Sequence, residues 1–102
     1  MTIHYVVIWD FDVEESGEVV KDGVVFSGLK SAQDKEIELL LASLDSDFSP
    51  RLLPVLSKRL GKTGYVTGVP SIYEVEALHP GYALQEAIEG RGKEVTEWRS
   101  AD

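Results

Sequence analysis

Hydrophobic and polar residues alternate along the first segment of the chain, residues 3–14. One set of alternate positions holds Tyr5, Val7, Trp9, Phe11 and Val13. The other set holds Val6, Ile8, Asp10, Asp12 and Glu14. Successive side chains of a strand point to opposite faces. Residues 3–14 are therefore predicted to form an interior strand, apolar on both faces in its middle, with a row of carboxylates on one face near its end.

The next segments predict a second strand and two helices. Residues 18–27 are rich in valine, and Asp22-Gly23 indicates either a short hairpin or a bulge in one longer strand. We favour one irregular strand paired with the first. Residues 32–44 predict a helix with Ser31 as N-cap and an apolar stripe. The stripe consists of Ile37, Leu40, Leu41 and Leu44. Residues 50–60 predict a second helix, because leucines recur at helical spacing after Ser49-Pro50.

The remaining residues predict two strands, a helix and a last strand. The strands are residues 65–67 and 71–78, separated by Val69-Pro70, with Glu74 and Glu76 on the outward face of the second. Residues 82–89 predict a helix whose inward positions are Ala83, Leu84, Ala87 and Ile88. Residues 93–99, which include Trp98, predict the last strand. The order β-β-α-α-β-β-α-β predicts one α+β domain over residues 1–102, a mostly antiparallel sheet with the helices packed on one face.

Charge is distributed unevenly along the chain and limits the classes of partner. The 102 residues carry a net charge of −8. Residues 51–63 run against this trend, because they contain four basic residues and no acidic one. A strongly acidic domain is repelled by phosphate backbones and by anionic membranes, so we expect neither direct nucleic-acid binding nor membrane binding. The absence of cysteine excludes disulfides and thiolate metal sites. The first residues have no signal-peptide features, so we expect a cytoplasmic protein.

One motif resembles the catalytic strand of an enzyme family. Asp10-Phe11-Asp12 at the end of an apolar strand resembles the nucleophile strand of haloacid dehalogenase-type phosphatases, in which two such aspartates bind magnesium. The resemblance implies a magnesium-dependent phosphatase with Asp10 as nucleophile. Glu14 departs from the family pattern, which has threonine or valine there, and no later segment offers the required lysine and paired acids. We therefore expect no enzyme, no catalytic residue, no metal and no cofactor.

The acidic residues support a binding function instead. We expect a small acidic non-enzymatic protein, similar to an inhibitor or immunity protein, whose acidic face docks onto a basic partner such as a nucleic-acid-binding protein. The candidate partner-binding residues are Asp10, Asp12, Glu14, Glu15, Glu18, Glu74, Glu76 and Trp98. The alternative is a homo-oligomeric assembly subunit that pairs an exposed sheet edge. A phosphatase is the minor third alternative.

Overall fold

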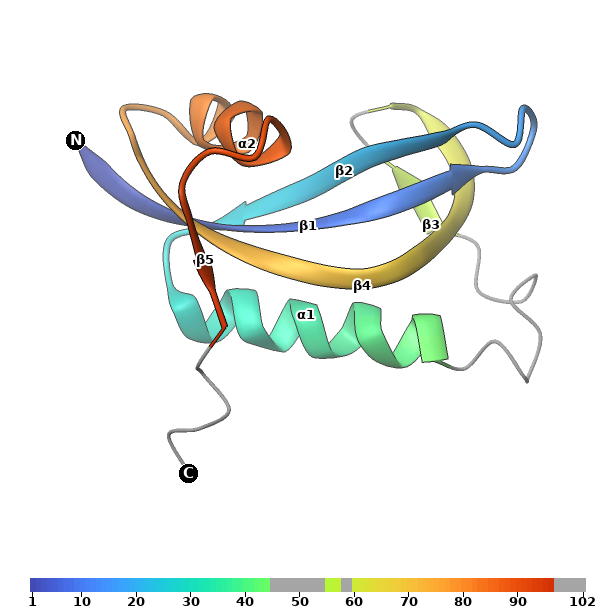
Figure 1. Ribbon diagram of the computed structural model, residues 1–102, viewed down its shortest axis with the longest axis horizontal. Helices are drawn as coiled ribbons and strands as arrows, with labels where there is room; N and C mark the ends of the chain where they lie inside the picture. The colour runs from blue at the N-terminus through green and yellow to red at the C-terminus, as the bar shows by residue number, and fades with distance from the viewer. Residues whose placement is uncertain (45–54, 58–59, 97–102) are drawn as a thin grey trace.

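The computed structural model describes residues 1–44, 55–57 and 60–96, which form a curved antiparallel sheet between two helices (Figure 1). The elements follow the order β1(Thr2–Val13), β2(Val19–Phe26), α1(Leu29–Leu44), β3(Val55–Ser57), β4(Lys62–Ala77), α2(Pro80–Ile88) and β5(Lys93–Val95). The sheet order is β2-β1-β4-β3, with β5 on the same edge of β4 as β3. The predicted α+β class with a mostly antiparallel sheet is confirmed. Within the described part, neither helix is long and apolar enough to cross a membrane.

The first strand is the centre of the fold, as its alternation predicts. β1 is hydrogen-bonded to β2 on one edge and to β4 on the other, both antiparallel. Val7 and Phe11 on one face and Val6 on the other are completely buried. The pairing with β2 runs without interruption through Asp22 and Gly23, which lie opposite Trp9 and Ile8. The prediction of one longer second strand paired with the first is therefore confirmed, but its predicted irregularity is wrong, since Asp22-Gly23 forms neither a turn nor a bulge.

The two helices cover opposite faces of the sheet, so the prediction that they share one face is wrong. α1 packs against the face that carries Val7 and Phe11, where Ala32 and Leu39 join the core. α2 packs against the face that carries Val6 and Ile8, where Ala83 and Ala87 are completely buried. Figure 1 shows the sheet lying between them. A strand apolar on both faces needs cover on both, and one helix on each side provides it.

The first helix begins earlier than predicted, and one residue of its predicted apolar stripe does not face the sheet. It begins at Leu29, so Ser31 lies inside the first turn and is not the N-cap. Ile37 is 38% exposed, whereas Glu36 is only 8% exposed. Among residues 29–39 of the helix the buried positions are 32, 36 and 39, so the inward position predicted for Ile37 is wrong. The side chains of residues 40–44 are outside the described set.

The leucine-rich segment after α1 does not form the predicted helix where it is described. Val55–Ser57 is a strand that pairs with residues 62–64 of β4. Residues 50–54 and 58–59 lie outside the described residues. The spacing of the leucines is compatible with the apolar stripe of a helix. Residues 55–57 form a strand instead, because the otherwise unpaired edge of β4 supplies backbone hydrogen bonds to it.

The two strands predicted at residues 65–67 and 71–78 are joined in one strand of sixteen residues, β4, which ends one residue before Leu78. Pro70 is accommodated because the register between β1 and β4 shifts between Ile8 and Asp10, opposite this part of β4. A proline cannot donate a ladder hydrogen bond and is confined in sheets to edges and bulges. The predicted helix 82–89 is confirmed as α2, and the predicted last strand appears in its first part as β5.

Candidate functional site

The β1–β2 hairpin ends in a rigid turn that carries three glutamates. The Val13 N–H donates to the Glu18 carbonyl at 2.9 Å, and the Gly17 N–H donates to the Val13 carbonyl at 2.8 Å. Gly17 has φ +71°, a left-handed conformation that glycine adopts without strain. The Glu14 N–H donates to the Thr63 carbonyl at 3.0 Å, which attaches the turn to β4. Glu14, Glu15 and Glu18 are exposed on this anchored turn.

Two further carboxylates lie on the same hairpin, within β1. Asp10 and Asp12 share the strand face of Val6 and Ile8, and both are half-buried. Lys21 Nζ donates to Asp10 Oδ1 at 3.2 Å across the β1–β2 pair. The two side chains are 53% and 45% exposed, so this surface ion pair contributes little to stability and leaves Asp10 accessible. We call Asp10, Asp12, Glu14, Glu15 and Glu18 the acidic hairpin end.

The predicted row of three strand carboxylates is partly wrong. β1 ends at Val13, so Glu14 belongs to the turn that follows the strand and not to the strand face of Asp10 and Asp12. Asp10 is engaged with Lys21, so it is not an isolated outward charge. Of the three predicted residues, Asp12 is the strand carboxylate for which no ion pair is described. The acidic hairpin end is therefore a cluster at one end of the sheet, with Lys21 and Lys62 as the described basic residues beside it.

The other predicted site residues are not part of this cluster. Glu74 lies opposite Tyr5 and Glu76 lies opposite Ile3, so both point to the face covered by α1. They also lie near the start of β1, whereas the acidic hairpin end lies at its finish. Glu74 is next to Lys93 of β5 in the sheet register. Trp98 lies outside the described residues, as do Arg51, Lys58 and Arg59 of the basic segment.

The carboxylates of the described residues do not converge on a point. No group of three or more His, Asp or Glu side chains there is placed to hold a metal ion. β1, which carries Asp10-Phe11-Asp12, lies between two antiparallel neighbours. The acidic hairpin end therefore presents several negative charges from a fixed backbone, and this is the chemistry that it offers to a partner.

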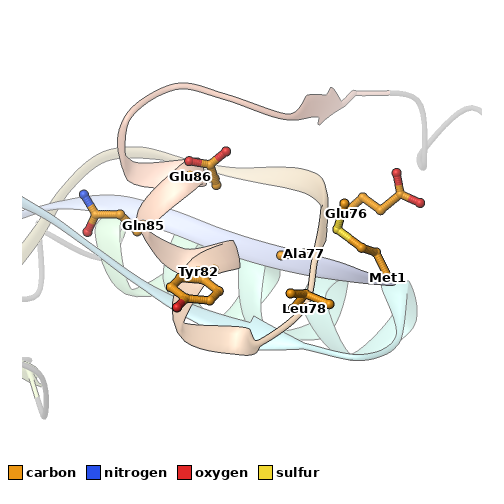
Figure 2. A pocket seen from close by; sticks show the side chains of 7 residues that line it. All are labelled: Met1, Glu76, Ala77, Leu78, Tyr82, Gln85 and Glu86. Carbon is orange, nitrogen blue, oxygen red and sulfur yellow. The ribbon is translucent and has the colours of Figure 1, made fainter.

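A second surface feature lies at the opposite end of β1, and sequence reasoning did not identify it. A pocket of about 330 Å³ is enclosed by Met1, the end of β4 and the first turns of α2 (Figure 2). Leu78 and Tyr82, on either side of His79-Pro80, form part of its wall. The sequence feature that could have indicated this pocket is the pair of large apolar residues, Leu78 and Tyr82, beside the turn-forming residues His79-Pro80-Gly81.

No protein-family model matches the chain, and neither the curated proteins nor the solved structures contain a match.

Proposed function

We propose that this protein is a small non-enzymatic binding protein, of the inhibitor or immunity type, that docks its acidic hairpin end onto a basic protein partner. A nucleic-acid-binding protein is the partner class that fits best, because such a protein presents basic side chains arranged for phosphates. The observation that supports the proposal is the gathering of five carboxylates on one hairpin whose turn is hydrogen-bonded to β4.

The rigidity of this hairpin matters as much as its charge. β1 is packed on both faces and the turn is hydrogen-bonded to β4, so the backbone that carries the carboxylates is fixed before a partner arrives. Preorganised groups lose less conformational entropy on association than groups on a mobile segment. Complementary charge raises the association rate and selects against acidic competitors, while apolar contacts supply most of the affinity. Glu74 and Glu76 lie on the other face and do not belong to the proposed surface.

The proposal is tested by neutralising the turn while keeping its shape. The variant Glu14→Gln/Glu15→Gln/Glu18→Gln removes three exposed charges. A matched control, Asp34→Asn/Glu38→Gln/Glu94→Gln, removes three exposed charges elsewhere. Affinity capture from the native cell, analysed by mass spectrometry at low and moderate salt, compares both variants with the unmodified protein.

We expect the unmodified protein and the control to retain the same basic protein and to release it as salt rises. The turn variant should lose it at low salt. Equal retention by the turn variant and the control would show that net charge alone, or another surface, is responsible. Circular dichroism of both variants checks that the fold is retained.

The alternative of a homo-oligomer is favoured by one observation. β2 is an edge strand of eight residues, and no described strand pairs with its outer edge. Unpaired strand edges are templates for pairing with another chain. Sedimentation velocity of the pure protein distinguishes the alternatives, since a concentration-dependent dimer would support edge pairing and a monomer would support the binding protein.

A further inference from the structure

β2 forms one border of the sheet, and the backbone groups on its outer side face away from β1 (Figure 1). The turn shows which residues these are, because the Val13 N–H donates to the Glu18 carbonyl. Hydrogen-bonded pairs alternate along an antiparallel ladder, and the register between β1 and β2 continues from there without a shift. Trp9 and Asp22 are therefore a hydrogen-bonded pair. The next residue, Gly23, points its N–H to the outer side of the sheet.

This outward N–H of Gly23 is bound within the chain. It donates to Oδ1 of Asp22 at 2.8 Å. Asp22 is only 3% exposed although it belongs to an edge strand, so its carboxylate is held against the protein and does not extend into solvent. A buried charged group that loses a hydrogen bond keeps the full cost of its desolvation. The bond to Gly23 is therefore one that the folded protein does not give up easily.

The Asp22 carboxylate lies where an added strand would have to bind. A strand that extended the sheet at β2 would place a carbonyl oxygen against the Gly23 N–H. Asp22 Oδ1 already accepts that N–H, and its negative charge repels a second oxygen. α2 covers the same stretch of β2, because a Cβ atom built at Gly23 would lie 3.0 Å from Leu84 Cδ1. An added strand would therefore have to displace a buried carboxylate beside a packed helix.

A second copy of this chain meets a further obstacle at this edge. When two copies of β2 pair antiparallel, residues with outward backbone groups lie opposite each other. The register centred on Asp22 then places the two Asp22 carboxylates directly opposite each other, and like charges in that position are destabilising. The register centred on Gly23 needs the outward Gly23 N–H of both copies, which Asp22 already binds.

We infer that Asp22 closes the outer edge of β2, so that this chain does not extend its sheet with a second copy of itself. Native proteins protect strand edges with inward-pointing charged residues and with lysine. Asp22 is the inward-pointing charge here, and Lys21 is an exposed lysine on the same strand. The inference argues against the homo-oligomer considered above. It does not rest on the proposed binding function, since no carboxylate of the acidic hairpin end takes part.

The test is sedimentation velocity of the pure protein over a range of concentrations. Asp22→Ala removes the acceptor, whereas Asp22→Asn removes the charge and keeps an oxygen that accepts the Gly23 N–H. We expect the unmodified protein and Asp22→Asn to remain monomers, and Asp22→Ala to associate as its concentration rises. The matched control is Asp34→Ala, which removes one exposed aspartate from α1 and should remain a monomer.

A double variant shows whether the association uses the edge of β2. The Lys21 N–H also points outward in this ladder, so Lys21→Pro removes an edge donor without removing a hydrogen bond to β1. Lys21→Pro/Asp22→Ala should therefore return to a monomer. Association of this double variant as strong as that of Asp22→Ala would place the contact elsewhere and overturn the inference. Dimerisation of the unmodified protein that Lys21→Pro abolishes would also overturn it, because the edge would then be open.

Hydrogen exchange measured by nuclear magnetic resonance decides the matter even when Asp22→Ala does not fold. The amides of Gly23 and Val25 both point outward from β2. In the unmodified protein we expect the Gly23 amide to be protected about tenfold more than the Val25 amide, because it donates to a charged group. Equal protection of the two amides would show that Asp22 does not hold the edge. An Asp22→Ala variant that is folded by circular dichroism and still monomeric at every concentration would equally refute the inference.

Discussion

Gly64 lies where β4 approaches β1 so closely that no side chain fits. A Cβ atom built there would lie 2.1 Å from the Asp12 carbonyl oxygen and 2.9 Å from Phe11 Cε2. Real Cβ contacts are essentially never shorter than 3.0 Å, so Gly64→Ala requires the backbone at Asp12 to move by about 0.9 Å. Asp12 lies in the central strand, paired with Tyr65 of β4 and Val19 of β2, so this movement disturbs both ladders.

We expect Gly64→Ala to lower the free energy of unfolding by about 3 kcal/mol, the upper end of the usual cost of overpacking. For a domain of this size each kcal/mol lowers Tm by about 4–8 °C, so the expected decrease is about 12–24 °C. Thermal and urea unfolding followed by circular dichroism measure both quantities. The matched control is Gly81→Ala, because a Cβ at Gly81 in the first turn of α2 meets nothing within 4 Å.

Gly81→Ala should raise the free energy of unfolding by about 0.4–1 kcal/mol, since alanine restricts the unfolded chain and favours the helix. A decrease of less than about 1 kcal/mol for Gly64→Ala would refute the close approach of β4 to β1 at this point. It would also weaken the argument that the acidic hairpin end is held rigidly, because that rigidity depends on the same pairing.

Three further predictions concern the same hairpin. Phe11→Ala should destabilise the protein by about 3–5 kcal/mol, because Phe11 is completely buried, whereas Val69→Ala should change urea unfolding by less than about 0.5 kcal/mol. A double-mutant cycle on Asp10→Asn and Lys21→Met should give a coupling below about 1 kcal/mol that fades with salt, and a larger, salt-insensitive coupling would contradict the exposed pair. Gly17→Ala should lower the free energy of unfolding by about 1–2 kcal/mol, because φ is +71°, and an unchanged Tm would argue against this turn conformation.

The elements that are recognisable from local periodicity were predicted well. The alternation from Tyr5 to Val13 is visible in the sequence and is borne out by β1, including its two buried faces. The inward positions of α2, Ala83 and Ala87, also follow from their helical spacing. In β1 and in α2 the spacing of the apolar residues is compatible with only one secondary structure that buries them, so the local prediction and the final fold agree.

The acidic hairpin end was predictable in part. The turn after Val13 and the sign of its charges follow from residues 14–18, which are adjacent in the chain. Whether Glu74 and Glu76 join them depends on the register of β4 against β1 and on the strand end at which each falls. Register is set by pairing between distant segments, so the sequence could not place these two carboxylates on the opposite face. The pocket at Tyr82 was missed for the same reason, since it requires Met1, β4 and α2 together.

Composition and periodicity thus established an acidic α+β chain with an interior first strand and a carboxylate-rich turn, because these properties depend on neighbouring residues. The three-dimensional arrangement decided which face each helix covers and made a strand of Val55–Ser57 within a leucine pattern that suits a helix. It also turned Glu36 rather than Ile37 toward the sheet. Each of these three features depends on a sheet face or a strand edge built from residues far away in the sequence. Such a face or edge exists only once the sheet has formed.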